Sequence, residues 1–324
     1  MDTMRAVRGH RRGGPEQLVH ETAPRPEPGP GDVLVAVRAA SITTGELAWD
    51  ATWTDSFDGS GRDRTPIVPA HEVSGVVVEQ GAGVTAPAVG VEVYGLVPFL
   101  RDGAAAEYVA VPAGILAAKP DGLDHQRAAA VPLAALTAWQ GLVDRAHLEP
   151  GRHVLVHGGA GGVGSFAVQI AAALGATVTA TASARDTGFV AGLGAHHVID
   201  YAAGRFDDQV ADVDVVFDTV GGATQTRSWG VLRPGGVLVS IVAPPDPGAA
   251  EDPGTRGVFF VVEPDRDGLD SISELITSGR LSPQIDRVVP LAQTRAAYEA
   301  LEKEHRRGKV VIHVADGQPA AAVL

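Results

Sequence analysis

The sequence contains no cysteine, and this single absence excludes several kinds of chemistry. Disulfide bonds, thiolate nucleophiles, cysteine-ligated iron–sulfur clusters and cysteine-rich zinc sites all need a residue that the chain lacks. We therefore expect neither a disulfide framework nor a thiolate active site.

A long apolar run is also missing. No stretch of about 18 apolar residues occurs, so we expect no membrane span. The arginines near the N-terminus (Arg5, Arg8, Arg11 and Arg12) are not followed by an apolar stretch, so we expect no secretory signal. With 45% hydrophobic and 20% charged residues, the composition is that of a soluble globular protein, and these points together predict a cytoplasmic location.

Positive charge is scarce relative to negative charge. The chain has 39 acidic residues against 26 lysines and arginines, which gives a formal net charge of −13. Because nucleic-acid binding relies on a basic surface that releases counterions, we do not expect a nucleic-acid partner. A phosphate-bearing cofactor is compatible with this charge, since a helix N-terminus and one or two arginines suffice to bind a phosphate.

At 324 residues the chain is long enough for two lobes, and its pattern of apolar and polar residues changes near residue 124. Before that point, short apolar stretches at 33–37, 76–78 and 91–94 predict strands separated by turns. The polar, glycine-rich stretch 55–64 is expected to form a mobile loop.

After residue 124 the pattern alternates between short strands and helices. Strands are predicted at 154–156, 178–182, 198–199, 215–217, 237–241 and 258–262. Six buried strands interleaved with helices are typical of a doubly wound parallel sheet, so the predicted fold class is α/β. Further on, the pattern predicts helices at 269–276 and 292–302, a strand at 310–314 and a disordered tail at 315–324.

A glycine-rich loop follows the first of these strands. Gly159, Gly161 and Gly164 satisfy the pattern G-x-G-x-x-G, and an amphipathic helix begins directly after them. The first glycine allows the tight turn, the second lets the backbone approach a pyrophosphate, and the third lets the helix pack against the strand. The loop therefore predicts dinucleotide binding by its residues Gly159, Ala160, Gly161, Gly162, Val163 and Gly164.

The end of the second strand indicates which dinucleotide binds. A site that prefers NAD places a carboxylate there to bind the ribose 2′-hydroxyl, whereas this chain has Ser183 and Arg185. Ser183 can donate a hydrogen bond to a 2′-phosphate and Arg185 supplies positive charge, so NADPH is favoured. Asp186 partly neutralises the region, and the alternative is that Arg185 is a solvated surface charge.

The chain resembles the medium-chain dehydrogenases/reductases, in particular their zinc-independent quinone oxidoreductase branch. The resemblance covers nearly the whole sequence and is carried by the order and spacing of several segments. These are 70–75 (AHEVSG, with Ala70 in place of a glycine), 106–109 (AEYV), 132–139 (PLAALTAW), the glycine loop, 198–201 (VIDY), 218–222 (DTVGG) and 308–311 (GKVV).

The resemblance implies a GroES-like β-rich catalytic domain at 1–124 and 265–324, and a Rossmann domain that binds NADPH at 125–264. It implies contacts with the nicotinamide region from Thr137 and from the backbone of Phe259, Phe260 and Val261. Arg185 and Tyr201 would flank the 2′-phosphate, and Lys309 would lie near the cofactor. The family is commonly dimeric through the cofactor domain, which implies a homodimer here.

No metal is expected. The zinc-dependent relatives use cysteines on an early loop and near residue 134, where this chain has Thr43, Thr44, Ala134 and Ala135. His71 alone cannot hold a catalytic zinc, which takes about three protein ligands. A rearranged site of His71, Glu72 and Glu46 is the weaker alternative. Where the branch usually has Asn and Asp, this chain has Thr43 and Glu46.

Without a metal, an acceptor that delocalises its own developing charge is favoured, such as a quinone or an α,β-unsaturated carbonyl. Catalysis would then rest on orientation in a dry cleft. Thr43, His71 and Tyr94 are candidate proton donors, although Tyr94 could be packing and His71 could be a structural residue. Trp49 and Trp53 could stack on a flat substrate or belong to the core.

Three functions remain open from the sequence. The first is a quinone or enone reductase with a small-molecule substrate. The second is a dedicated reductase or cyclase of secondary metabolism, which the unusual loop 43–53 favours. The third is a non-enzymatic NADPH-binding protein.

Overall fold

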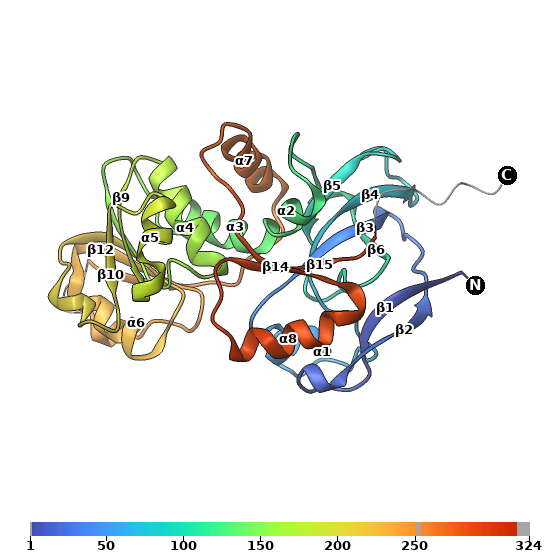
Figure 1. The fold of residues 1–324 in the computed structure, drawn as a ribbon, viewed down its shortest axis with the longest axis horizontal. Coiled ribbons are helices and arrows are strands. Elements are labelled where there is room, and N and C mark those ends of the chain that lie inside the picture. Colours follow the sequence, from blue (N-terminus) through green and yellow to red (C-terminus); the bar gives the residue numbers. More distant parts are fainter. Residues whose placement is uncertain (1, 251, 253, 316–324) are drawn as a thin grey trace. The chain divides into compact units, whose positions relative to one another are not determined.

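The computed structural model describes residues 2–250, 252 and 254–315 (Figure 1). The tail predicted to be disordered therefore lies outside the described residues, apart from residue 315. The chain divides into two compact units. The first unit comprises residues 1–133, 263–273 and 283–324, and the second comprises 134–262 and 274–282.

The first unit is built around a seven-stranded sheet and a separate hairpin. The hairpin pairs β1 (Thr3–Gly9) with β2 (Leu18–Pro24). Along the sheet the strands follow the order β14 (Ile285–Pro290), β15 (Lys309–His313), β3 (Asp32–Ile42), β4 (Glu72–Gln80), β5 (Glu92–Leu96) and β7 (Ala117–Ala118), and β6 (Tyr108–Pro112) pairs with β3. All eleven residues of β3 are buried because this strand has neighbours on both sides.

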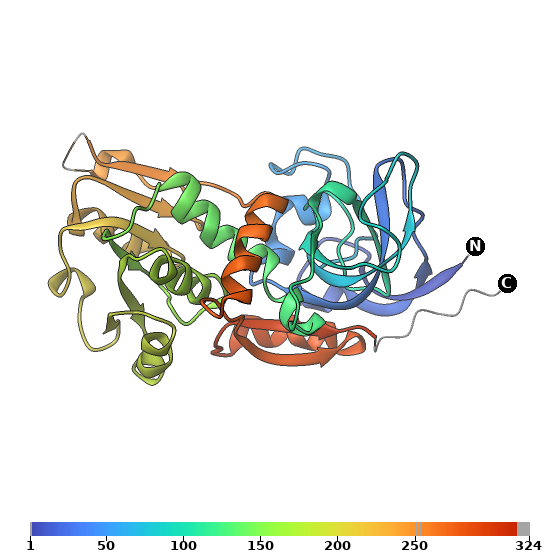
Figure 2. The same cartoon turned by 90° about the horizontal axis from the view of Figure 1, so that it is seen from above.

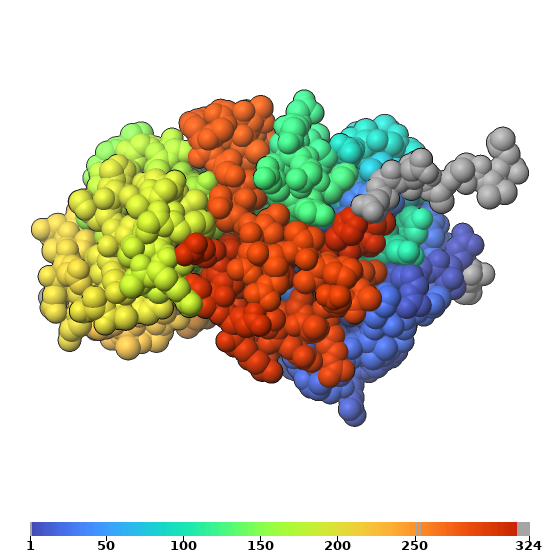
Figure 3. All heavy atoms as spheres, viewed as in Figure 1, coloured from blue at the N-terminus to red at the C-terminus, as the bar shows by residue number. Residues whose placement is uncertain are grey.

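Several helices belong wholly or largely to this unit. They are α1 (Asp50–Trp53), α2 (His125–Ala129), the first part of α7 (Arg266–Thr277) and α8 (Thr294–Lys303). α8 is amphipathic: Ala297, Tyr298 and Leu301 join the hydrophobic core, whereas its polar face lies at the surface shown in red-orange in Figure 3.

The second unit contains the six-stranded sheet that the sequence predicts. Its order is β10 (His197–Asp200), β9 (Thr177–Ala182), β8 (His153–Val156), β11 (Val213–Asp218), β12 (Leu232–Ser240) and β13 (Arg256–Phe259), with every pairing parallel. The helices along it are α3 (Pro132–Trp139), α4 (Gly162–Ala173), α5 (Thr187–Gly192) and α6 (Gly222–Ser228). The colours from green to orange in Figure 2 follow this alternation.

The α/β prediction is thus confirmed, down to each of the six parallel strands. β8 is the first strand and pairs with both β9 and β11, so the chain reverses its direction of winding beside β8. In parallel sheets, ligands bind at such a switch point, outside the carboxyl ends of the strands. The residues 158–164 lie at this place.

The structure also contains strands that the sequence analysis does not predict, namely β1, β2, β6, β7 and β14. β1 and β14 carry charged residues between their apolar ones, with Arg5 and Arg8 in β1 and Asp286 and Arg287 in β14. The boundaries also differ in detail from those expected at 124 and 264. α2 packs against β3 and β4, which keeps residues 125–133 with the first unit.

Candidate functional site

The glycine loop of the second unit connects β8 to α4. Gly158 has a φ of +73°, a conformation that favours glycine, and its carbonyl accepts a hydrogen bond from the Gly161 N–H at 3.0 Å. A Cβ on Gly164 would lie 2.1 Å from that same carbonyl oxygen. Glycine at 164 therefore lets the first turn of α4 pack directly against the loop.

The N-terminus of α4 is open to an anion. No described side chain forms a capping hydrogen bond there, and Gly161, Gly162 and Val163 are half-buried. The backbone N–H groups of the first helical turn lack partners within a helix and carry a partial positive charge. Together with the glycine loop 158–164, these N–H groups fit the pyrophosphate of a dinucleotide.

At the end of β9 the structure corrects one expectation and supports another. The Ser183 hydroxyl donates its hydrogen to Asp186 Oδ2 at 2.5 Å, so it does not serve as the predicted donor to a 2′-phosphate. The same contact holds the Asp186 carboxylate in the interior, where its side chain is 0% exposed. Arg185 is exposed. At this strand end an arginine is therefore exposed and the neighbouring carboxylate is buried.

Large apolar side chains are exposed at the carboxyl ends of the other strands. Among the described residues of the second unit, every exposed large hydrophobic side chain lies at the end of a strand from β10 to β13 or within two residues after it. They are Tyr201, Val220, Val242, Phe259 and Val261, whose exposed fractions run from 40% to 61%. Exposing such side chains to water is unfavourable, so a set confined to one edge indicates a ligand-binding surface.

Not every residue predicted near the nicotinamide is part of that exposed edge. Phe260 alternates with its neighbours and is buried, with Arg145 of the same unit over its ring at 5.7 Å. Thr137 of α3 is also buried.

A buried carboxylate shapes the loops that carry the exposed side chains. Asp218, the last residue of β11, accepts hydrogen bonds from the N–H groups of Val220 and Gly221, each at 2.9 Å. It also accepts the Ser240 hydroxyl at 2.9 Å, which ties the ends of β11 and β12 together. Gln225 of α6 completes the network by donating to Asp218 and to the carbonyl of Ala243.

His157, between β8 and the glycine loop, is a second buried polar residue that connects neighbouring elements through hydrogen bonds. Its Nε2 lies 2.9 Å from the Ser228 hydroxyl and its Nδ1 lies 3.3 Å from the Thr181 hydroxyl. Its carbonyl accepts the Thr219 hydroxyl at 2.7 Å. Burial lowers the pKa of His157 to about 4, so the ring is neutral at physiological pH. His157 thus links the ends of β8 and β9 to α6 without introducing charge.

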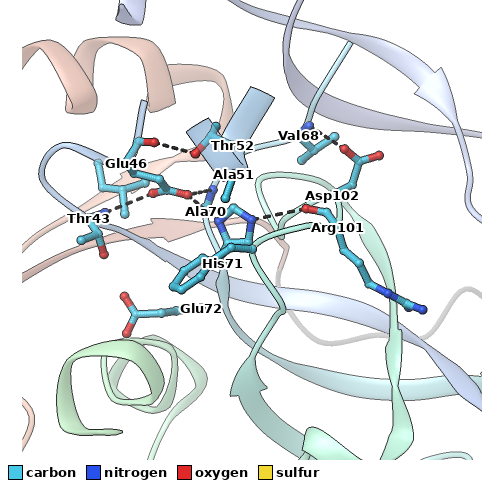
Figure 4. Close-up of polar contacts among 12 residues, drawn as sticks. Thr43, Glu46, Ala51, Thr52, Val68, Ala70, His71, Glu72, Arg101 and Asp102 are labelled. Carbon is cyan, nitrogen blue, oxygen red and sulfur yellow. Dashed lines mark hydrogen bonds and ion pairs between the residues drawn. The ribbon is translucent and has the colours of Figure 1, made fainter. Parts of the chain in front are cut away.

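The first unit holds a different kind of site, a buried carboxylate surrounded by donors (Figure 4). Glu46 Oε1 accepts from the Ala70 N–H at 2.7 Å and lies 2.8 Å from His71 Nδ1. Its Oε2 accepts from the Tyr298 hydroxyl at 2.8 Å and from the Thr43 N–H at 3.3 Å. Burial raises the pKa of Glu46, but these hydrogen bonds and the charge of His71 outweigh burial and lower it below its usual value.

His71 lies in a structural position. Its side chain is 2% exposed, and its Nε2 faces the carbonyl of Arg101 at 3.3 Å while its Nδ1 faces Glu46. Both ring nitrogens are therefore engaged by protein oxygens, as the ring between Ala70 and Arg101 in Figure 4 shows. This geometry favours the hydrogen-bonded structural interpretation over a role in a substrate pocket.

A second buried carboxylate, Glu72, lies beside the first. Its Oε2 forms an ion pair with the Lys309 ammonium at 2.5 Å, and its Oε1 accepts from the Leu133 N–H at 3.0 Å. Lys309 Nζ also donates to the Thr43 hydroxyl at 3.1 Å and to the Ile42 carbonyl at 3.2 Å. Lys309, predicted to lie near the cofactor, is thus held inside the first unit with a 4% exposed side chain.

Tyr94 and Trp53 are buried, which favours the alternative that they belong to the core over a contact with substrate. The Tyr94 hydroxyl donates to the carbonyl of Leu269 at 2.9 Å, and burial raises its pKa well above the usual value. The Trp53 indole donates to the Leu47 carbonyl at 2.7 Å. Trp49 is half-buried, and its ring meets Phe99 edge to face at 5.3 Å.

A cavity of about 360 Å³ opens in this unit next to the loop 43–48. Its volume lies within the range of small-molecule sites. It is lined by Arg12, Gly13, Gly14, Thr43, Thr44, Gly45, Leu47, Ala48, Tyr298, Leu301 and Glu302. Thr43 therefore both lines this cavity and contacts the Lys309 ammonium.

Within 2–250, 252 and 254–315, no group of three or more His, Asp or Glu side chains is arranged to hold a metal ion. No helix of that part of the chain has the length and apolarity needed to cross a bilayer.

Sequence reasoning missed several residues of these clusters. Tyr298 lies 252 residues from its partner Glu46, so no local pattern indicates it. Asp218 lies in the segment 218–222, and two of its partners, Val220 and Gly221, lie in the same segment. Glu46 and Glu72 were named only as weak metal ligands. A usable signal existed for Glu72, because a carboxylate inside the otherwise apolar strand segment 72–78 needs a buried donor.

Family models match both parts of the chain. Residues 29–121 match the alcohol dehydrogenase GroES-like domain, and residues 193–312 match a domain described as zinc-binding dehydrogenase. A probable mitochondrial zinc-binding oxidoreductase of Arthroderma benhamiae is 33% identical over 317 residues, which cover 92% of this chain and 93% of that protein.

Other relatives and a solved structure agree with this likeness. An NADPH-dependent chloroplastic alkenal/one oxidoreductase of Arabidopsis thaliana is 38% identical over 76% of this chain and 64% of its own. A polyketide synthase of Streptomyces halstedii is 35% identical over 90% of this chain, which corresponds to 5% of the synthase. The quinone oxidoreductase structure from Coxiella burnetii superposes with a TM-score of 0.87 at 30% identity, covering 97% of this chain and all of that one.

Proposed function

This chain belongs to the medium-chain dehydrogenase/reductase superfamily as a quinone-oxidoreductase-like member, and from that premise we propose that it uses NADPH to reduce a quinone or an α,β-unsaturated carbonyl. Several relatives are named as oxidoreductases, and the name of the Arabidopsis thaliana protein states that it depends on NADPH.

The preference for NADPH rests on one observation, the exposure of an arginine and the burial of the neighbouring carboxylate at the end of β9. Asp186 is turned inward by Ser183, and Arg185 is exposed. A 2′-phosphate at this strand end would meet a guanidinium rather than a carboxylate. The glycine loop 158–164 also suits a pyrophosphate. A Cβ at Gly164 would collide with the Gly158 carbonyl, so glycine at this position lets the N-terminus of α4 lie close against the loop.

The bound cofactor supplies a hydride, and the protein supplies position. The exposed apolar side chains after β11, β12 and β13 would pack against the dinucleotide. Asp218 and His157 hold the loops that carry or adjoin them, so the surface is ordered before the cofactor binds.

Zinc independence is part of the proposal. His71 is engaged through both ring nitrogens, and the chain has no cysteine. An acceptor that delocalises negative charge onto its own oxygen fits such a site, since quinones and enones need less help from a Lewis acid than simple ketones. Metal analysis of the purified protein tests this point, and stoichiometric zinc would contradict it.

Two further properties stay predictions. A homodimer through the cofactor domain is compatible with β13, an edge strand of the sheet with exposed residues along it. The cytoplasmic location is untested, and the names of relatives include mitochondrial and chloroplastic proteins.

The experiment is a fluorescence titration with NADPH and NADH, followed by turnover with a panel of quinones and enals. We expect Arg185→Ala to weaken NADPH binding roughly 10- to 100-fold, because a charge-assisted contact is lost, and to leave NADH binding within about twofold. Arg205→Ala is the matched control, since the Arg205 guanidinium pairs with Asp207. Equal losses for both cofactors would remove Arg185 from the phosphate site.

A dedicated biosynthetic reductase is the second candidate. The likeness to a segment of a polyketide synthase favours it, because the matched piece lies within a large biosynthetic enzyme. This function predicts tight NADPH binding, weak turnover of simple enals and quinones, and strong turnover of an enoyl thioester. A non-enzymatic NADPH-binding protein would turn over none of these acceptors.

A further inference from the structure

The Lys309 ammonium is surrounded by oxygen atoms of the first unit. Its Nζ lies 2.5 Å from Glu72 Oε2, 3.1 Å from the Thr43 hydroxyl and 3.2 Å from the Ile42 carbonyl. Glu72 is 0% exposed and Lys309 is 4% exposed. Because a buried ion pair in this geometry is costly to break, the ammonium is fixed in place.

This arrangement determines what the Thr43 hydroxyl does. An ammonium group has only donors, so the Thr43 oxygen must accept the hydrogen bond from Lys309. Among the described residues, no acceptor takes the hydrogen of the Thr43 hydroxyl itself. Thr43 is half-buried, so this hydrogen can reach a ligand from outside the core.

The backbone of Thr43 is fixed as well. Its N–H donates to Glu46 Oε2 at 3.3 Å, and the carbonyl of the preceding Ile42 accepts from Lys309. Both buried carboxylates therefore help to fix Thr43. Glu46 accepts a hydrogen bond from its N–H, and Glu72 holds the Lys309 ammonium that donates to its hydroxyl. A hydroxyl that accepts from a cation becomes a stronger donor, because hydrogen bonds in a chain polarise one another.

We propose that the Thr43 hydroxyl, polarised by Lys309, donates a hydrogen bond to the carbonyl oxygen of the acceptor substrate. This inference rests on the proposed function and makes Lys309 a positioning residue rather than a cofactor contact. As hydride adds to the β-carbon of an enone, the alkene electron pair shifts onto the carbonyl oxygen. Thr43 stabilises that oxygen, and the α-carbon then takes its proton from water.

The role of Thr43 also restricts the substrate. A donor fixed by two buried charges acts on one oxygen at one position, in the manner of an oxyanion hole. The acceptor must therefore carry a carbonyl or quinone oxygen conjugated with the carbon that receives hydride. Quinones delocalise charge over two oxygens, so they should depend on Thr43 less than enals do.

A chromophoric enal tests the proposal without turnover. The visible band of 4-(dimethylamino)cinnamaldehyde moves to longer wavelength when its carbonyl oxygen accepts a stronger hydrogen bond. We would add this probe to the protein saturated with NADP⁺, which cannot supply hydride. We expect a red shift for the wild type and for Thr43→Ser, no shift for Thr43→Val, and a reduced shift for Lys309→Met.

Turnover of cinnamaldehyde with NADPH gives a second readout. We expect Thr43→Val to lower kcat about 100-fold, as removal of one oxyanion donor does, and Lys309→Met to lower it about tenfold. Thr43→Ser should retain most of the activity. Because Lys309→Met leaves a buried carboxylate unpaired, the double variant Lys309→Met/Glu72→Gln removes both charges and should show the same reduced shift.

Lys119→Met is the matched control. Lys119 is another lysine of the first unit with a largely buried side chain, and it pairs with Glu92 at 3.2 Å. Lys119→Met should keep the wild-type shift.

The inference is overturned if Thr43→Val or the double variant keeps the wild-type shift and kcat. It is overturned too if the wild type reduces cinnamaldehyde without shifting the probe, an outcome that leaves the proposed function standing. A protein that binds no NADPH would instead contradict the proposed function.

Discussion

The two units differ in where they place groups that cost free energy. The second unit exposes large apolar side chains at the carboxyl edge of its sheet, from Tyr201 to Val261. Both units also bury carboxylates. Asp218 in the second unit orders a loop at that edge, whereas Glu46 and Glu72 in the first unit lie among apolar strands and hold donor groups in place. Each arrangement costs free energy in the isolated chain, so each indicates where the molecule is shaped for something other than stability.

The difference separates two tasks. An exposed apolar edge gains free energy when a ligand covers it, which suits binding. Buried carboxylates gain nothing from a ligand directly, but they fix the donors around them, which suits the positioning of a single group such as Thr43. The variants below test whether binding and positioning are separable in this way.

The largest effect on cofactor binding is expected at the glycine loop. Gly164→Ala would place a Cβ 2.1 Å from the Gly158 carbonyl oxygen, so the first turn of α4 would have to move. A displacement of this size at a pyrophosphate site should weaken NADPH binding about 100-fold or more, measured by fluorescence titration. Gly192→Ala is the control, because a Cβ there meets no atom within 4 Å. Wild-type affinity in Gly164→Ala would place the dinucleotide elsewhere.

The next effect concerns the first unit. Glu46→Gln would leave His71 without its carboxylate partner and should lower the free energy of urea unfolding by about 3–5 kcal/mol. Glu92→Gln should cost at most about 1 kcal/mol, since Glu92 is largely exposed. If the tasks are separable, Glu46→Gln will retain NADPH binding under folding conditions while enal reduction falls. Loss of both in parallel would contradict the separation.

The same carboxylate gives a pH dependence with a defined sign. The pKa of Glu46 is lower in the folded protein than the usual 4.5, so its contribution to stability is present above about pH 4.5. It is lost as the pH falls through the folded-state pKa. Glu46→Gln should therefore make the free energy of unfolding depend less on pH below pH 4.5. An unchanged dependence would contradict the stabilising role of the Glu46 carboxylate.

In the second unit, His157 gives an acid dependence at higher pH. Burial lowers its pKa from about 6.5 to about 4, so the unfolded chain binds a proton before the folded one does. Stability should fall as the pH decreases from about 6.5 to about 4, by about 2 kcal/mol at pH 5. His157→Gln should lack this part of the slope in urea unfolding, whereas His197→Gln, at an exposed position, should keep it.

The smallest effect tests the apolar edge itself. Val220→Thr replaces one exposed methyl group with a hydroxyl of similar size and should weaken NADPH binding roughly fourfold. The exposed Val288 of β14 lies in the first unit, so Val288→Thr should leave affinity unchanged. If both variants bind NADPH like the wild type, the exposed edge does not serve the cofactor.

Much of the second unit could be predicted from the sequence because its strands are short, apolar and separated by helices. The glycine pattern also gave the right place for the loop, since Gly164 is required by a contact within a few residues of chain. Ser183 shows the limit of this reasoning. Its hydroxyl could have served a phosphate, but Asp186, three residues later, takes its hydrogen in the structure.

The first unit was harder to predict for a physical reason. β1 and β14 interleave charges with apolar residues, so their strands have no clear period. Its polar clusters are assembled from distant segments, with Tyr298 reaching Glu46 across 252 residues and Lys309 reaching Thr43 across 266. The resemblance to a family indicated His71 and Lys309 as residues of interest, but only the folded chain gives their partners.

The central claim is that the second unit binds a phosphorylated dinucleotide along the carboxyl edge of its sheet. Isothermal titration calorimetry with NADPH and NADH tests it directly. The account predicts one NADPH site per chain with a Kd in the micromolar range and at least tenfold weaker NADH binding. Absence of binding heat and of competition for both cofactors at millimolar concentration would contradict it.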